Sequence, residues 1–205
     1  MTGEMTAKQP HRPPVAVLGA GTMGSSMVQR MLDLGFAVKV WNRTPGPAAA
    51  LAEHGAIACA TPTEAVAGAE VVVTMLPNAE AVADVMLRAG TLDALWANAT
   101  WAQMGTIGVE ATERLAAEVA RQRPDVLFVD APVSGSREPA RKGQLLVLAS
   151  GPDRSHDAVD VVFAALGQRT LWLGPAGTAS RLKLVLNAWL AFEVEAAAEA
   201  RLEFE

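Results

Sequence analysis

A glycine-rich turn near the start of the chain has the residues to hold a dinucleotide phosphate. The turn has the spacing G-x-G-x-x-G and consists of Gly19, Ala20, Gly21, Thr22, Met23 and Gly24. We interpret Gly19 as permitting the tight turn, Gly21 as letting a pyrophosphate approach the backbone, and Gly24 as letting helix and strand pack closely. Because the turn leaves an apolar strand and opens a helical pattern, its context favours a binding site over a plain turn.

The residues after the second expected strand indicate which dinucleotide is bound. A site that prefers NAD usually has Asp or Glu there, accepting a hydrogen bond from the ribose 2′-hydroxyl. This chain instead has Asn42, Arg43 and Thr44. Arg43 can pair with a 2′-phosphate, and Asn42 and Thr44 can hydrogen-bond to it. We therefore predict that NADP(H) is preferred over NAD(H), the alternative being a solvated arginine in a turn.

A helix at the C-terminal end of the chain carries two more residues that could do chemistry. From Thr178 to Phe204 there is neither Pro nor Gly, which predicts one helix of about 27 residues. Lys183 and Asn187 are four apart and therefore share a face. Apolar residues surround much of this helix, a pattern typical of a helix buried by partners. Either the chain is a piece of a longer protein, or the helix packs against another copy in a homodimer or larger assembly.

Alternating strand and helix patterns connect these sites. Short apolar runs predict strands at Val15–Leu18, Ala37–Trp41, Val71–Met75, Ala99–Gln103, Leu127–Asp130, Leu145–Ser150 and Thr170–Leu173. Helical patterns lie between most of them: from the glycine turn to near Gly35, then Pro47–His54, Ala79–Arg88, Val109–Gln122 and Ser155–Ala165. The expected fold is α/β, a Rossmann-type, doubly wound, mostly parallel sheet followed by one long C-terminal helix. We expect residues 1–13 to be flexible, 14–177 to form the cofactor-binding domain, and 178–205 to form the long helix.

Composition excludes several other classes of protein. Of 205 residues, 51% are hydrophobic and 19% charged, which is typical of a globular protein. The net charge of −5, with no basic run, argues against a nucleic-acid partner. The one cysteine and the dispersed histidines predict no disulfide and no metal site. No apolar stretch has the length of a membrane span or a signal peptide, so a cytoplasmic location is expected.

Five motifs, in order along the chain, resemble the β-hydroxyacid dehydrogenase family. They are VLGAGTMGSSMVQRML from Val17, VWNRT at 40–44, VVVTMLPN at 71–78, DAPVSGS at 130–136 and GTASRLKLVLN at 177–187. The run from Ser136 to Leu145 looks most like the glyoxylate/succinic semialdehyde reductase branch, which prefers NADPH. The family's fold is a Rossmann domain, a long interdomain helix and an all-helical domain, and this chain resembles only the first two.

This resemblance implies roles for particular residues. Lys183 is the expected general acid/base, and Asn187 is expected to orient the substrate oxygen or Lys183. Ser134 and Gly135 would bind the carboxylate of a small substrate, Leu76 and Pro77 would line the cofactor cleft, and Thr106 would lie near the nicotinamide amide. An ammonium group suits the reaction, because hydride addition to a carbonyl builds negative charge on oxygen. For the reverse reaction, the pKa of Lys183 should fall below its ordinary value.

One segment departs from the family pattern. Where the family usually has Asp-x-Ser-Thr, this chain has Gln103, Met104, Gly105 and Thr106. The departure puts cofactor positioning and substrate preference in question. The leading hypothesis is reduction of a small aldehyde acid of the glyoxylate, succinic semialdehyde or 3-hydroxyisobutyrate type. An imine reductase on the same fold, or a non-catalytic NADP-binding module, are the alternatives.

Overall fold

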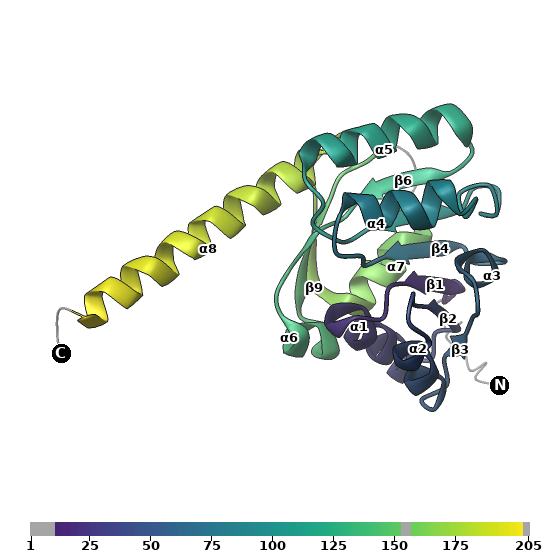
Figure 1. Ribbon diagram of the computed structural model, residues 1–205, viewed down its shortest axis with the longest axis horizontal. Helices are drawn as coiled ribbons and strands as arrows, with labels where there is room; N and C mark the ends of the chain where they lie inside the picture. Colours follow the sequence, from purple (N-terminus) through teal and green to yellow (C-terminus); the bar gives the residue numbers. More distant parts are fainter. Residues whose placement is uncertain (1–10, 153–156, 203–205) are drawn as a thin grey trace, which may run out of the picture.

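A parallel six-stranded sheet forms the centre of the computed structural model, which describes residues 11–152 and 157–202 (Figure 1). The strand order is β3-β2-β1-β4-β5-β6. The strands are β1 (Val15–Leu18), β2 (Val38–Trp41), β3 (Ile57–Ala58), β4 (Val71–Thr74), β5 (Thr100–Gln103) and β6 (Leu127–Asp130). This arrangement confirms the expected Rossmann-type sheet.

Helices cover both faces of this sheet, so its central strands are buried throughout. The helical elements are α1 (Thr22–Asp33), α2 (Pro45–Ala52), α3 (Pro62–Val66), α4 (Ala79–Ala83), the π-helical turn η1 (Asp84–Arg88), α5 (Val109–Gln122), α6 (Arg137–Lys142), α7 (Asp157–Leu166) and α8 (Thr178–Leu202). Successive strand residues point to opposite faces. Val15 and Val17 of β1 therefore join one hydrophobic core with α1, α2, α6 and α7, whereas Ala16 and Leu18 join a second core with α3, α4, η1 and α5.

A second, smaller sheet was not anticipated. The strands expected at Leu145–Ser150 and Thr170–Leu173 are present as β8 (Leu145–Ala149) and β9 (Gly167–Trp172), but they pair with each other and with β7 (Val133–Ser134). β7 is antiparallel to β8, and β8 is parallel to β9. Asp130 and Ser150 form an isolated antiparallel bridge, so the chain passes directly from the large sheet to the small one.

The other differences from expectation are local. β3, α3, β7 and α6 were not expected, because elements of two to six residues are too short to show a periodic pattern. The helix expected at Ala79–Arg88 continues after Ala83 as the π-helical turn η1. For the helix expected at Ser155–Ala165, the described part is α7, and Ser155 and His156 lie outside the described residues. Most of the segment 1–13 also lies outside them.

The long helix is continuous, as expected, and projects away from the domain (Figure 1). It contacts β6, β8 and α5 only near its start. Further along, large apolar side chains are exposed, with Val185 63%, Trp189 64% and Phe192 70% accessible. None of the helices in the described ranges has the length and apolarity needed to cross a bilayer.

Candidate active site

The glycine turn between β1 and α1 depends on close backbone approach. Gly19 has a φ of 109°, and a Cβ atom there would lie 2.4 Å from the carbonyl oxygen of Met75. A Cβ atom on Gly24 would lie 1.9 Å from the carbonyl oxygen of Gly19. A Cβ atom on Gly21, in contrast, would meet nothing within 4 Å. Two of the glycines therefore pack the turn, while the third leaves open space above the helix.

The N-terminus of α1 is available to an anion. Its N-cap residue is Gly21, with no side-chain cap, and its first turn has no acidic residue. Gly21 and Thr22 are exposed, whereas Ala20 is buried. A helix N-terminus presents unpaired N–H groups and the positive end of the dipole, so these residues fit a phosphate group.

The loop after β2 is fixed to the glycine turn by Asn42. The Asn42 Oδ1 atom accepts a hydrogen bond from Ala20 N at 2.9 Å, and its Nδ2 atom donates to Thr44 O at 2.9 Å and Thr44 Oγ1 at 3.0 Å. The expected hydrogen bond from Asn42 to a 2′-phosphate needs a free N–H, and both N–H groups are already used. Asn42 therefore positions the loop, while the exposed Thr44 hydroxyl still has its hydrogen to donate.

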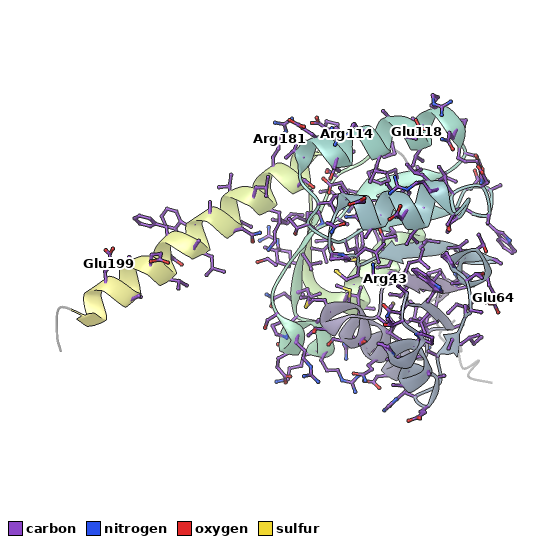
Figure 2. All side chains as sticks on the ribbon, in the orientation of Figure 1. Arg43, Glu64, Arg114, Glu118, Arg181 and Glu199 are labelled. Atoms are coloured by element: carbon purple, nitrogen blue, oxygen red, sulfur yellow. The ribbon has the colours of Figure 1, made fainter. Side chains whose placement is uncertain are left out.

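Arg43, labelled in Figure 2, lies between Asn42 and Thr44 in the sequence and is exposed. Within the described residues, its guanidinium group has no hydrogen-bond or ion-pair partner. An arginine held on a fixed loop with all its donors free is suited to bind a phosphate.

The departure at residues 103–106 has a structural explanation. The Gln103 side chain is fully buried and links two strand ends: its Oε1 atom accepts from Thr74 Oγ1 at 2.6 Å, and its Nε2 atom donates to Gly105 O at 2.7 Å. Trp101 Nε1 also donates to Thr74 Oγ1, at 2.8 Å. Gln103 thus takes a structural role in place of the family's Asp.

Gly105 lets the loop after β5 approach the loop after β4. A Cβ atom on Gly105 would lie 2.6 Å from the carbonyl oxygen of Leu76, so the family's Ser does not fit this spacing. Leu76 is half-buried, and Pro77 and Thr106 are exposed. Both loops follow the carboxyl ends of neighbouring parallel strands, which is the edge where open α/β sheets bind ligands.

The loop expected to bind substrate follows β6 through β7. Ser134 is half-buried at the end of β7, and Gly135 is exposed with a φ of 132°. A Cβ atom on Gly135 would lie 2.8 Å from Leu145 Cδ2 and 3.3 Å from Pro139 Cβ. A side chain at position 135 would therefore be both strained and crowded.

Lys183 lies near the N-terminal end of α8. Its side chain is half-buried, and this burial lowers the pKa of its amine below the ordinary value of 10.5. No described residue forms an ion pair with it. Asn187, one turn further along, is exposed. A half-buried amine without a carboxylate partner can exchange a proton with a neighbouring oxygen.

Sequence reasoning missed Asp130, the last residue of β6. Its side chain is 1% exposed, and burial raises the pKa of its carboxyl group while hydrogen bonds from Ser180, Ser150 and Gly177 oppose that rise. The available signal was an acidic residue ending an apolar strand within the DAPVSGS motif. Among the described residues, no group of three His, Cys, Asp or Glu side chains is arranged to hold a metal ion.

Known proteins are similar to this chain in sequence. Residues 14–174 match the family model described as the NAD binding domain of 6-phosphogluconate dehydrogenase. The chain is 33% identical over 174 residues to glyoxylate/succinic semialdehyde reductase 1 of Arabidopsis thaliana, covering 84% of this chain and 60% of that protein. The chain belongs to the β-hydroxyacid dehydrogenase family.

Two solved structures have a fold similar to that of this chain. The structure of Mycobacterium tuberculosis 3-hydroxyisobutyrate dehydrogenase with L-serine has a TM-score of 0.86 and 29% identity, covering 93% of this chain and 64% of that one. Psf3 in complex with NADP+ and 2-OPP has a TM-score of 0.82 and 27% identity, covering 90% of this chain and 66% of that one. This chain therefore spans about two thirds of the length of these relatives.

Proposed function

We propose that this chain is the cofactor-binding part of an NADPH-dependent oxidoreductase that interconverts a small aldehyde acid and its hydroxy acid. Lys183 is the general acid/base. The observation that carries the proposal is the half-buried Lys183 amine, with its lowered pKa, on a helix that starts beside the carboxyl end of β6. This is the edge of the sheet at which the glycine turn and the loops after β4 and β5 also lie.

The cofactor preference is supported by the charge of the loop after β2. The glycine turn and the N-terminus of α1 would hold the pyrophosphate, Leu76 and Pro77 would line the cleft, and Thr106 would contact the nicotinamide amide. Arg43 and Thr44 would bind the 2′-phosphate, with Asn42 holding their loop in place. Because no carboxylate stands at the end of β2, nothing there repels a phosphate.

The chemistry divides between the cofactor and Lys183. Bound NADPH would supply the hydride. As the substrate carbonyl carbon accepts that hydride, negative charge develops on its oxygen, and Lys183 Nζ donates a proton to it. In the reverse direction, the neutral amine takes the hydroxyl proton, which a lowered pKa makes easier. Asn187 would orient the reacting oxygen, and Ser134 and Gly135 would bind the substrate carboxylate through a hydroxyl and an N–H.

Calorimetric titration tests the cofactor assignment. We expect the chain to bind NADPH more tightly than NADH. Arg43→Ala should weaken NADPH binding about 10- to 100-fold, the value of a charged hydrogen bond of ~1.5–3 kcal/mol, and leave NADH binding unchanged. The control is Arg114→Ala, which removes an exposed arginine on α5. Equal affinity for both cofactors in the parent chain would overturn the assignment.

Turnover tests the role of Lys183. The assay follows NADPH oxidation with glyoxylate, succinic semialdehyde or a cyclic imine as substrate. Lys183→Ala should abolish aldehyde reduction without loss of fold, whereas Lys142→Ala, on the surface of α6, should not change it. Full turnover by a folded Lys183→Ala protein would refute the role. Turnover of the imine without the aldehydes would favour an imine reductase.

A further inference from the structure

The Asp130 carboxylate holds the first turn of α8. Its Oδ2 atom accepts hydrogen bonds from Ser180 N at 2.9 Å, Gly177 N at 3.1 Å and Ser150 Oγ at 3.1 Å, and its Oδ1 atom accepts one from Ser180 Oγ at 2.8 Å. Ser150 Oγ in turn accepts from Ala179 N at 3.0 Å. The N–H groups of a helix's first turn have no hydrogen-bond acceptors within the helix. Here Asp130 and Ser150 supply those acceptors.

This group, Asp130, Ser150 and Ser180, is buried, and we refer to it as the helix clamp. All three side chains are at most 2% exposed. Thr112 of α5 also reaches it, with its Oγ1 atom 3.2 Å from Ser180 Oγ. Outside the clamp, the exposed Arg181–Glu113 ion pair, at 2.7 Å, links α8 to α5. The clamp therefore joins β6, the end of β8, α5 and α8 at one buried point.

Asp130 also begins the segment that carries the expected substrate loop. Four residues after it, Ser134 ends β7, and the Asp130–Ser150 backbone bridge fixes the start of that segment. On the other side, Lys183 follows Ser180 by three residues, or about 4.5 Å along the helix axis. Asn187 is about 10 Å along the axis, on the exposed part of α8. Lys183 is thus the closer of the two to the clamp.

We propose that Asp130 is a positioning residue, whose buried carboxylate fixes the Lys183 amine relative to the Ser134–Gly135 loop. The importance of this placement for turnover rests on the proposed function. The placement itself does not, because it follows from the hydrogen bonds between Asp130 and the helix start. Asp130 acts through Lys183 and the loop, and is not itself expected to touch substrate.

Two substitutions separate this role from simple packing. Asp130→Asn keeps an oxygen for Ser180 N and Gly177 N, and its amide nitrogen can donate to Ser180 Oγ. Asp130→Ala removes every one of these acceptors. The control is Glu113→Gln, which removes the exposed ion pair at the same junction but leaves the clamp intact. If Asp130→Ala does not fold, Ser180→Ala is a milder substitution. It removes the hydroxyl that donates to Asp130 Oδ1 but keeps the backbone N–H that donates to Asp130 Oδ2.

The first readout uses the chain itself and requires no turnover. Hydrogen exchange measured by mass spectrometry should be at least about tenfold faster over residues 177–186 in Asp130→Ala, and faster by a smaller factor in Ser180→Ala if that replaces it. The pH dependence of Lys183 amine labelling should shift towards an ordinary lysine. Asp130→Asn and Glu113→Gln should match the parent chain in both measurements. Unchanged exchange and unchanged Lys183 labelling in the folded clamp variant would overturn the proposal.

The second readout links the clamp to the reaction. In Asp130→Ala, kcat should fall at least about tenfold while the NADPH dissociation constant stays within about twofold, and Asp130→Asn should restore kcat. Equal losses of NADPH binding and kcat, with no rescue by Asn, would indicate a general structural role and overturn the proposal. The two proposals can fail separately. If Lys183→Ala keeps full turnover while hydrogen exchange over residues 177–186 is faster in Asp130→Ala, the proposed function is wrong but the role of Asp130 in holding the helix is supported.

Discussion

The Oδ1 atom of Asn42 accepts a hydrogen bond from the backbone N–H of Ala20 at 2.9 Å, across 22 positions of sequence. This bond joins the glycine turn, expected to hold the pyrophosphate, to the loop expected to hold the 2′-phosphate. The segments expected to hold the pyrophosphate and the 2′-phosphate are therefore fixed relative to each other without a ligand. Such preorganisation lowers the entropy cost of binding.

Asn42→Asp should reverse the cofactor preference. The carboxylate can still accept from Ala20 N, but it cannot donate to Thr44, and it places a negative charge beside the expected 2′-phosphate. We expect NADPH affinity to fall about tenfold or more, because the new carboxylate repels the 2′-phosphate and the loop loses the hydrogen bonds that Asn42 donates to Thr44. NADH affinity should be kept or improved. Calorimetry with both cofactors measures this, and an unchanged NADPH preference would contradict it.

Gly24→Ala should destabilise the domain. The new methyl group would lie 1.9 Å from the Gly19 carbonyl oxygen, so the turn or the helix must move, at a cost of at least ~1–3 kcal/mol. Gly46→Ala is the matched control, because a Cβ atom there meets nothing within 4 Å. Urea unfolding followed by circular dichroism distinguishes them, and equal midpoints would contradict the expected clash.

Gly105→Ser restores the family's residue and should nevertheless be harmful here. The serine Cβ would lie 2.6 Å from the Leu76 carbonyl oxygen, which forces apart the loops after β4 and β5. We expect a loss of ~1–3 kcal/mol in unfolding free energy. The neighbouring Thr106→Ser, on an exposed side chain, should be neutral. If both variants unfold at the parent's urea concentration, the two loops have more room than their spacing indicates.

Local sequence patterns were sufficient to predict the main sheet. The run Val71–Met75 was predicted as a strand and is β4 (Val71–Thr74), because a short apolar run flanked by turns is typical of a buried parallel strand. The glycine turn could also be predicted from the sequence, because Gly19 and Gly24 are needed where the backbone segments approach closely. The pairing of the later strands could not be predicted, because β8 has the same apolar pattern whichever sheet it joins.

Contacts between distant residues account for most of what the sequence did not reveal at the site. Asp130 meets Ser180 across 50 positions, and neither residue type indicates the other as its partner. Asn42 was expected to hydrogen-bond to a 2′-phosphate, whereas its side chain bonds the backbone of Ala20 and Thr44, and these partners could not be read from spacing. Gln103 stood out as a departure from a family pattern, and its buried amide pairs only through the folded ends of β4 and β5.

Lys183→Met should raise stability at neutral pH, by an amount that shrinks as the pH rises. Burial lowers the pKa of Lys183 in the folded protein below 10.5, so the unfolded chain binds the proton more tightly. The charged form therefore costs stability at pH values below the folded pKa. This cost disappears as the pH rises from the folded pKa through 10.5. Urea unfolding of parent and variant across that range measures the difference, and a constant difference would contradict the lowered pKa.

The exposed apolar residues of α8 should drive association of the isolated chain. Val185, Trp189, Leu190 and Phe192 are each more than half exposed, and soluble monomers rarely expose such a continuous apolar surface. Light scattering should detect a dimer or larger species whose mass rises with concentration. Replacing Val185, Trp189 and Phe192 together by Gln should give a monomer that binds NADPH as before, because these positions lie beyond the clamp. A monodisperse parent monomer at high concentration would show that exposed apolar surface on this helix does not suffice for association.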